Sequence, residues 1–294
     1  MRPLKPVILI ALVSCTVALQ AQTRDENWKR CEGPDWAARI DACSAILQSS
    51  QETDANKARA LFRRGQAHRR MSDPGDALDD YNRSLQLDPK LAASYFGLGL
   101  VYMSKAEYER AIEEFSEGLQ LDPTYADGYT LRGNVYSSIG DSVRAVADFD
   151  RALQLNPTSA DAYYNRARVR GNRGEYERSI PDWDRAIQYK PGDADSYYGR
   201  GIAYFRAGND ERAIQDLTET LRINPQYASA LYWRRRAYLH EGNYLAAIAD
   251  RFRAIQLKLG TRTILIRFAV LAFSIVLTAA CLFLFLRKEA QSNR

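Results

Sequence analysis

Apolar and small residues recur along most of the chain at intervals of three and four, the spacing of one face of an α-helix. In residues 125–157 this pattern runs twice, is interrupted by a turn near Gly140 and ends at Asn156-Pro157. A proline disfavours helical conformation in the residue before it, so Asn-Pro marks a helix end. The pattern predicts two antiparallel helices joined by a short turn.

This helix pair is copied along the chain with a fixed period. Five prolines stand 34 residues apart, at Pro89, Pro123, Pro157, Pro191 and Pro225. A column of mostly small residues contains Gly65, Gly99, Gly133, Ala167, Gly201 and Arg235, and a column of bulky residues contains Tyr81, Phe115, Phe149 and Trp183. Small residues let two helices approach closely, and large ones fill the space between them. A period of this length indicates one supersecondary unit repeated as a solenoid.

The glycine, tyrosine, alanine, aromatic and proline columns resemble the tetratricopeptide repeat. The resemblance covers six units, at 58–91, 92–125, 126–159, 160–193, 194–227 and 228–261. It implies an all-α, right-handed solenoid whose first helices line the inner face. The sixth unit departs from the pattern at Arg235, Arg251 and Leu259, and Pro181 is expected to kink or delay the second helix of the fourth unit.

Arginine and aspartate also recur at matched positions. An arginine lies sixteen residues before an aspartate in five units, at Arg64, Arg132, Arg166, Arg200 and Arg234 before Asp80, Asp148, Asp182, Asp216 and Asp250. The second unit changes both positions, to Leu98 and Glu114. The spacing predicts an Arg–Asp ion pair between the two helices of a unit or between adjacent units. The alternative is that both residues are solvated surface charges.

Both ends of the chain are apolar. Residues 1–21 combine Arg2 and Lys5 with an apolar run, as a secretory signal does. Cys15 ends a sequence similar to a bacterial lipidation site, although an ordinary cysteine in the signal is the preferred interpretation. Phe268 to Leu286 carry no charge, so residues 264–286 are predicted to form a transmembrane helix and residues 287–294 a cytoplasmic tail. This topology would leave the repeats outside the cytoplasm.

Two cysteines, Cys31 and Cys43, remain in the predicted soluble part. Residues 24–57, which precede the first full unit, are interpreted as an N-terminal cap. A Cys31–Cys43 disulfide would fix the incoming segment to this cap, and an exported protein permits such a bond. A reduced pair in the core is the alternative. No histidine or third cysteine lies near enough in sequence to indicate a metal site.

Motifs for other chemistry are absent from the sequence. The 294 residues carry a net charge of +5 without a basic run outside the repeats that would indicate nucleic-acid binding. The glycines lie singly on the repeat grid, and the chain has only two histidines. We therefore predict no enzyme activity, no cofactor, no metal and no nucleic-acid partner.

The resemblance places a set of side chains on the inner face, where a partner would bind. These candidate groove residues are Phe62, Arg63, Phe96, Asn134, Tyr164, Asn165, Arg168, Tyr198 and Trp233. Aromatic and arginine side chains suit polypeptide partners with acidic and apolar side chains. Asn134 and Asn165 match the two asparagines that hold a peptide backbone in carboxylate-clamp members of the family. The accompanying basic residues are replaced by Thr130, Asp195 and Gly199, and the asparagines could equally be ordinary polar surface.

The sequence thus predicts a membrane-anchored scaffold that mediates protein–protein interactions on the extracytoplasmic (periplasmic) side of a single-pass membrane protein. It resembles an exported bacterial repeat protein with a C-terminal anchor, with a role in envelope assembly or maintenance. The alternative is a glycan-binding or enzyme-associated envelope component. Basic residues of the sixth unit, including Arg251, Arg253 and Lys258, are expected to face lipid headgroups at the C-terminal end.

Overall fold

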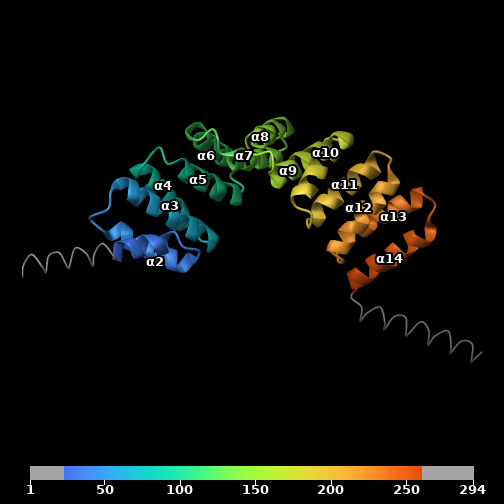
Figure 1. The fold of residues 1–294 in the computed structure, drawn as a ribbon, viewed down its shortest axis with the longest axis horizontal. Helices are drawn as coiled ribbons and strands as arrows, with labels where there is room; N and C mark the ends of the chain where they lie inside the picture. Colours follow the sequence, from blue (N-terminus) through green and yellow to red (C-terminus); the bar gives the residue numbers. More distant parts are fainter. Residues whose placement is uncertain (1–22, 260–294) are drawn as a thin grey trace, which may run out of the picture. The chain divides into compact units, whose positions relative to one another are not determined.

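A computed structural model describes residues 23–259, and over this range the chain is all-α (Figure 1). Residues 23–31 are helical, and α2 (Trp36–Gln48) follows. The first helices of the repeat pairs are α3 (Asp54–Arg70), α5 (Ala92–Ser104), α7 (Ala126–Ser138), α9 (Ala160–Asn172), α11 (Ala194–Arg206) and α13 (Ala228–His240). The second helices are α4 (Pro74–Leu87), α6 (Tyr108–Leu121), α8 (Ser142–Leu155), α10 (Tyr176–Tyr189), α12 (Asp210–Ile223) and α14 (Tyr244–Leu259).

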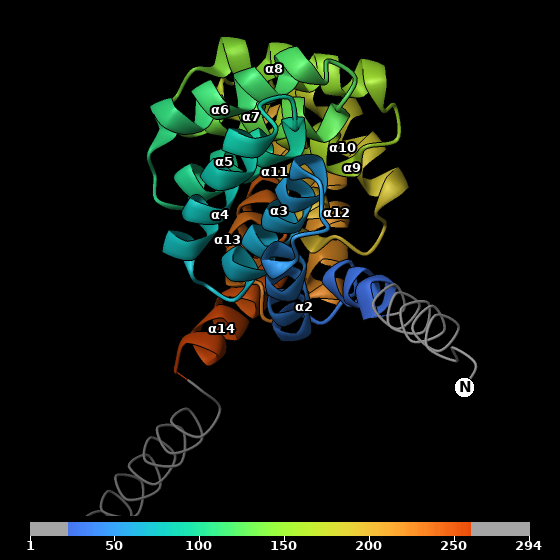
Figure 2. The same cartoon turned by 90° about the vertical axis from the view of Figure 1, so that its left-hand side faces the viewer.

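The chain divides into two compact units between Val169 and Arg170, within α9. In the first unit α3 packs on α4, α5 on α6 and α7 on α8, while α3 also contacts α5 and α5 contacts α7 (Figure 2). In the second unit α11 packs on α12, α13 packs on α14, and α11 contacts α13. Within each unit, then, first helices of successive pairs lie side by side.

The turn inside each pair requires a left-handed backbone conformation. Gly140, Gly174, Gly208 and Gly242 occupy this position with φ between 74° and 82°. The first two pairs place Ser72 (φ 65°) and Ala106 (φ 58°) there instead. Glycine adopts positive φ without a steric penalty, so four of these six turns use the residue that favours the tight reversal.

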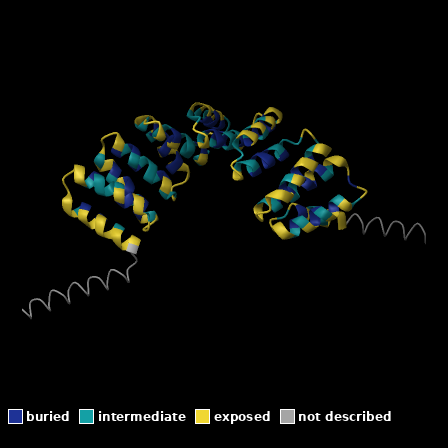
Figure 3. Cartoon of the chain, turned by 180° about the vertical axis from the view of Figure 1, so that it is seen from behind, coloured by how far each residue is buried: buried dark blue, intermediate teal, exposed yellow. Residues whose placement is uncertain are grey.

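Aromatic side chains of the second helices pack against glycines of the first helices. A Cβ atom added to Gly65 would lie 2.9 Å from the Tyr81 ring, and one added to Gly99 would lie 2.5 Å from Phe115. Phe149 meets Gly133 in the same way. Tyr81, Phe115 and Phe149 are all 0% exposed, and the buried residues gather between paired helices while the outer surfaces are exposed (Figure 3). The predicted match between small and bulky columns is confirmed.

The predicted Arg–Asp pairs are buried structural contacts in four of the six repeat units. Each arginine donates Nε and Nη2 to the two carboxylate oxygens of its aspartate, at 2.6–2.9 Å, in the pairs Arg64–Asp80, Arg132–Asp148, Arg200–Asp216 and Arg234–Asp250. The four aspartates are only 3–6% exposed. The alternative of solvated surface charges is therefore wrong for these pairs. The fifth pair, between Arg166 and Asp182, stays a prediction; within their own parts of the chain, Asp182 accepts a hydrogen bond from Arg170 at 2.7 Å and Arg166 donates to Asp150.

The third nitrogen of each arginine reaches back to the preceding helix pair. Nη1 of Arg132 donates to Ser116 Oγ at 3.0 Å, and Nη1 of Arg234 donates to Thr218 Oγ1 at 2.9 Å. Arg166 and Arg200 bind Asp150 and Asp184 in the same position of the repeat. One guanidinium therefore connects the two helices of its own pair and the pair before it.

The second pair lacks this contact, as its sequence predicted. Leu98 is 2% exposed and packs in the apolar cluster with Tyr81 and Val101. Glu114 has no arginine in this column to bind. Burial, together with the charges of Glu113 and Glu117, raises the pKa of Glu114 to about 6.

Pro181 does not act as predicted, whereas the sixth unit does. The predicted delay of α10 is wrong, because α10 begins at Tyr176 and continues past Pro181 to Tyr189. Pro181 is the sixth residue of this helix, where it removes one intrahelical donor without ending the helix. The sixth unit forms a complete helix pair, α13 and α14, despite its altered residues.

The apolar ends of the chain lie outside the described residues. This applies to the predicted signal peptide (1–21) with Cys15, the predicted membrane span (264–286) and the tail (287–294). Between residues 23 and 259, no helix is both long and apolar enough to cross a membrane.

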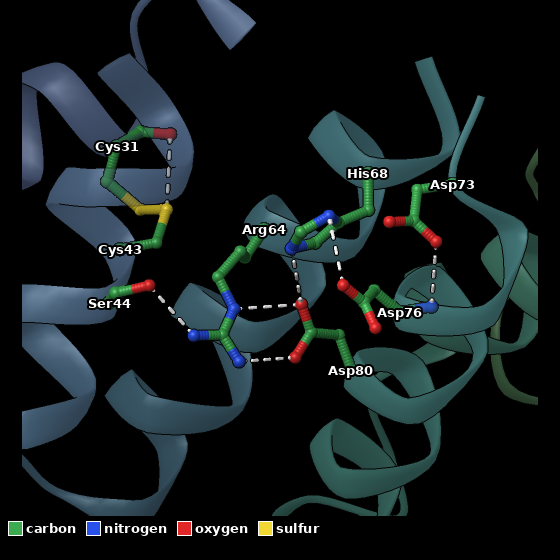
Figure 4. Close-up of polar contacts among 8 residues, drawn as sticks. All are labelled: Cys31, Cys43, Ser44, Arg64, His68, Asp73, Asp76 and Asp80. Carbon is green, nitrogen blue, oxygen red and sulfur yellow. Dashed lines mark hydrogen bonds and ion pairs between the residues drawn. A yellow bond between two sulfur atoms is a disulfide. The ribbon is translucent and has the colours of Figure 1, made fainter. Parts of the chain in front are cut away.

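The N-terminal segment is fixed by the predicted disulfide. Cys31 and Cys43 are bonded, with Cα atoms 4.9 Å apart, and both are 0% exposed (Figure 4). The bond connects the helix of residues 23–31 to α2. Ser44, next to Cys43, accepts a hydrogen bond from Arg64 at 2.8 Å, which links α2 to the first repeat pair.

A buried carboxylate adds a second connection at this end. Glu52, 6% exposed, accepts hydrogen bonds from Arg24 Nε at 2.6 Å, Asn56 Nδ2 at 2.7 Å and Trp28 Nε1 at 3.2 Å. The hydrogen bonds from Arg24, with smaller contributions from Asn56 and Trp28, lower the pKa of Glu52 to about 2. Glu52 therefore holds the first helical segment against the start of α3.

We expect Glu52→Gln to destabilise this end by about 2 kcal/mol at pH 7, because the charged acceptor of three donors is lost. The folded-state pKa lies below the value of 4.5 for a free side chain, so the contribution is complete above pH 4.5 and is lost between about pH 4.5 and 2. Urea unfolding at several pH values measures the difference between wild type and variant. Glu26→Gln, at an exposed position nearby, is the control. A wild-type advantage that stays constant down to pH 2 would contradict this assignment.

Candidate functional site

An apolar pocket of about 260 Å³ opens in the first unit between α3, α4, α5 and the start of α7. Its lining includes the apolar and aromatic side chains of Phe62, Phe96, Leu100, Tyr125 and Leu131. Phe96 and Tyr125 lie with ring centroids 4.7 Å apart. Two of the predicted groove residues, Phe62 and Phe96, are therefore brought to one site.

Glycines determine the shape of this pocket. A Cβ atom on Gly97 would lie 2.6 Å from the Tyr81 ring, and one on Gly128 would lie 2.7 Å from Phe96. These distances are too short for any real side chain. Tyr81 and Phe96 can occupy their positions only because the helices facing them lack side chains there.

Two lining residues of the pocket carry buried polar atoms. Tyr81 Oη and Arg69 Nε make no hydrogen bond of normal geometry to another described residue, although the Arg69 guanidinium lies close enough to Tyr81 Oη to interact with it. Burial raises the pKa of Tyr81 to about 12, an effect that the nearby Arg69 guanidinium opposes. The Tyr81 hydroxyl is therefore neutral and able to donate at physiological pH. Gln66 adds an amide at the same site.

Family models match most of the repeat region. Residues 58–91 and 126–159 match a tetratricopeptide repeat model, residues 101–140 match a TPR repeat model and residues 164–228 match a second tetratricopeptide repeat model. Together the matched segments exceed half of the 294 residues. The chain belongs to the tetratricopeptide repeat (TPR) family. A comparison with curated protein sequences found no significant match.

Several solved structures share the fold. YrrB, described as a TPR protein with an unusual peptide-binding site, is 24% identical with a TM-score of 0.56, covering 66% of this chain and 97% of YrrB. MamA is 28% identical with a TM-score of 0.52, covering 58% of this chain and 94% of MamA. Pseudomonas aeruginosa PilF is 16% identical with a TM-score of 0.61, covering 69% of this chain and 92% of PilF.

The other predicted groove residues of the first compact unit, which ends at Val169, vary in their surroundings. Arg63 lies 5.5 Å from the Phe62 ring centroid and donates to Gln66 at 3.3 Å. Asn134 Oδ1 is buried without a hydrogen-bond partner among the described residues. Asn165 accepts a hydrogen bond from the exposed Arg168 at 3.4 Å, and Tyr164 beside it is half-buried. Asn134 thus retains an unused acceptor, whereas Asn165 is already engaged.

In the second unit, the predicted residue Trp233 lies within a cluster of aromatic and arginine side chains. Phe205 packs edge-on against Trp233 at 5.4 Å. The guanidinium groups of Arg236 and Arg206 lie 4.9 Å and 5.1 Å from the Trp233 ring. We call Phe205, Arg206, Trp233 and Arg236 the aromatic–arginine cluster. Tyr198, also predicted, pairs instead with Tyr227 at 4.8 Å.

Two kinds of arginine can now be distinguished. The column arginines, such as Arg64 and Arg200, bind buried aspartates. Arg69, Arg206 and Arg236 have no carboxylate partner within the described part of the chain. A guanidinium lying over an aromatic ring keeps hydrogen-bond donors available for a further anion. The unpaired arginines are therefore the ones that suit a partner.

The repeat pattern does not predict a polar role for Tyr81. In that pattern Tyr81 is one member of the bulky core column with Phe115, Phe149 and Trp183. The signal was nevertheless present, because Tyr81 is the only tyrosine in this column. A buried hydroxyl needs a hydrogen-bond partner, whereas a phenylalanine fills the same space without one.

His68 lies beside the first Arg–Asp pair (Figure 4). Its Nδ1 is 3.9 Å from Asp76 and its Nε2 is 3.9 Å from Asp80. Asp73, close to both His68 and Asp76, caps the start of α4 by accepting from Asp76 N. The tertiary structure thus brings together three residues of metal-ligand type, His68, Asp73 and Asp76, whose spacing matches no known metal motif. Asp73 is already engaged as the cap of α4.

We expect Phe96→Ala to destabilise the first unit by about 3–4 kcal/mol, because Phe96 is 7% exposed and its loss leaves a cavity between α5 and α6. Arg168→Ala should change stability by less than about 0.5 kcal/mol, since that side chain is exposed. Urea unfolding measures both effects, with Phe96→Leu as the apolar control. Similar unfolding midpoints for the alanine variants would show that Phe96 belongs to the groove surface alone.

Proposed function

We propose that the protein is a membrane-anchored TPR scaffold that binds polypeptides on the extracytoplasmic side, in envelope assembly or maintenance. TPR proteins mediate protein–protein interactions, and the repeat fold is typically a non-catalytic scaffold. The observation that carries the proposal is the set of arginines, Arg69, Arg206 and Arg236, that lie beside aromatic side chains and have no carboxylate partner within residues 23–259. Such surfaces favour polypeptides with acidic and apolar side chains.

The comparison with YrrB is consistent with this proposal. YrrB shares the fold and is described as having a peptide-binding site. Asn134, with its unused buried acceptor, is a candidate for holding the amide groups of a bound backbone. Asn165, already bonded to Arg168, would contribute only after that contact is exchanged.

Several features support the extracytoplasmic location. Residues 1–21 have the composition of a secretory signal, and residues 264–286 contain an uncharged stretch long enough to span a bilayer. The Cys31–Cys43 disulfide suits an oxidising compartment. These observations together favour a protein anchored at its C-terminal end with its TPR units outside the cytoplasm.

The last helix offers a surface suited to lipid. Five apolar side chains of α14 are 41–83% exposed, namely Tyr244, Leu245, Ile248, Phe252 and Ile255. They lie on the face opposite the buried Ala247 and Asp250. Arg251 and Lys258 border this stripe on one side and Arg253 on the other. An apolar stripe between basic residues is typical of helices that lie at an anionic membrane surface.

The repeat itself explains why Phe252 can be apolar. In earlier pairs the same position holds Ser116, Asp150, Asp184 and Thr218, which accept a hydrogen bond from the arginine of the next pair. One period after Arg234 the chain has Phe268, which is uncharged and belongs to the predicted membrane span. Phe252 therefore has no column arginine to bind, and a polar residue is not needed there. We propose that this apolar stripe of α14 contacts an anionic lipid bilayer.

Partner binding should depend on charge. The full chain in nanodiscs is tested against short Gly-Ser peptides that carry one aromatic and one acidic residue, and against a neutral oligosaccharide. We expect binding of the peptides that falls steeply between about 0.1 M and about 1 M salt, since the charges on the groove are exposed to solvent. Arg206→Gln with Arg236→Gln should reduce it, and Arg178→Gln with Arg185→Gln, on the outer helix α10, should not. Salt-independent binding of the oligosaccharide alone would favour the glycan alternative.

Contact with lipid is tested by photo-crosslinking. The photoreactive residue p-benzoylphenylalanine is placed at position 252 of the full chain in vesicles with and without anionic lipid, and at position 218 as the control one repeat earlier. We expect lipid adducts at position 252, more with anionic lipid, and few at position 218. Crosslinks between two copies of the chain in place of lipid adducts would assign the stripe to self-association.

A further inference from the structure

The pocket between α3 and α5 contains a hydroxyl that the fold itself does not use. Tyr81 is 0% exposed, and its Oη makes no hydrogen bond of normal geometry within the described residues; the neighbouring Arg69 side chain, which interacts with it, is itself a donor, so the Tyr81 O–H has no acceptor there. Phe115 and Phe149 fill the same place in later pairs with no polar atom. Packing therefore requires the ring and not the oxygen. A buried hydroxyl that lacks a partner is unfavourable, and its presence in one pair alone points to a ligand.

Arg69 supplies a positive charge at the same place. Its Nε is also buried without a partner, and no carboxylate within residues 23–259 pairs with its guanidinium. The one acid among the lining residues, Asp122, is held in its own loop by Thr124, whose backbone N and Oγ1 donate to it at 3.1 Å and 2.7 Å. The unused donors of the pocket, the Tyr81 hydroxyl and the Arg69 guanidinium, therefore lie together and lack an acceptor.

The apolar walls of the pocket indicate what the ligand contains besides an anionic group. Phe62, Phe96 and Leu131 present apolar surface around these donors, and the volume of about 260 Å³ accommodates a large side chain together with a neighbouring polar group. A free inorganic anion would leave this apolar surface exposed to water. A ligand that joins an apolar body to an anionic end would satisfy both parts.

We propose that this pocket is an anchoring subsite for a carboxylate beside an aromatic or large aliphatic side chain of a bound polypeptide. The carboxylate accepts hydrogen bonds from Tyr81 Oη and from the Arg69 guanidinium, while the apolar side chain packs against Phe62 and Phe96. Oη is covered in the free protein and Arg69 interacts with it, so entry of the carboxylate requires the Arg69 side chain to turn from Oη toward the ligand. The inference rests on the proposed polypeptide binding and identifies the residue pair that this subsite selects.

Tyr81→Phe separates this role from packing. The variant keeps the ring that contacts Gly65 and Gly97 and removes only the unpartnered oxygen. We expect its thermal midpoint to equal or exceed that of the wild type, since an unsatisfied buried group is removed. A clear loss of stability would mean that the hydroxyl serves the fold, and would overturn the proposal.

Binding is measured with the full chain in nanodiscs and the same Gly-Ser peptides. We expect Tyr81→Phe and Arg69→Gln each to weaken binding of the peptide with an adjacent Phe and Glu by about tenfold, the effect of losing a hydrogen bond to a charged group. Replacing Glu by Gln in the peptide should weaken binding to the wild type and have little further effect on the variants. Tyr176→Phe and Arg83→Gln, at positions outside the pocket, are the matched controls.

Two further comparisons make the outcome specific. Peptides with a free or an amidated C-terminus distinguish a side-chain carboxylate from a terminal one, and equal binding of both would assign the site to the side chain. If the wild type binds the peptides but Tyr81→Phe and Arg69→Gln bind them equally well, the subsite is wrong while polypeptide binding stands. If the wild type binds no peptide of the set, the proposed function fails and this inference fails with it.

Discussion

In the first four TPR pairs, the second helix places a large side chain in a space that the first helices leave open. Tyr81 lies against Gly65 and Gly97, Phe115 against Gly99, Phe149 against Gly133 and Trp183 against Gly199, at distances that no Cβ atom would tolerate. Because both partners recur every 34 residues, each pair sets the same separation between its helices and offers the next pair the same surface. The remaining contacts of the array depend on this separation.

The Arg–Asp contacts illustrate that dependence. Once the helices lie at a fixed distance, Arg132 reaches both carboxylate oxygens of Asp148 and the hydroxyl of Ser116 in the preceding pair. A planar guanidinium can make these three contacts only when both neighbouring helices are correctly placed. Where the second pair has Leu98, the apolar cluster around Tyr81 extends and Glu114 has no arginine of this column to bind.

The two ends of the repeat array are closed in different ways. At the N-terminal end, the Cys31–Cys43 disulfide and the hydrogen bonds of Glu52 close the first unit against solvent. At the C-terminal end, α14 exposes Leu245, Ile248 and Phe252, so its outer face has the apolar character of an interior surface. Repeat arrays need a polar cap where they meet water. An apolar end is consistent with the lipid contact proposed for this helix.

The sequence by itself determined the helix pairs, their period, the match of glycine to aromatic columns and four of the Arg–Asp pairs. These features follow from spacing, because each repeat places equivalent residues in equivalent surroundings. The Cys31–Cys43 pairing instead follows from the number of cysteines in the predicted soluble part. Phe62 and Phe96 were likewise predicted for the groove from their positions in the repeat, and they line one pocket.

Only the tertiary structure decided which polar groups remain unused. Tyr81 belongs to the same column as Phe115, and Arg69 is one of several arginines near the end of α3, so neither stands out in the pattern. Their availability depends on atoms contributed by α4, α5 and the loop around Asp122. Whether a polar atom has a partner is decided by neighbours from several helices, and no local periodicity records it.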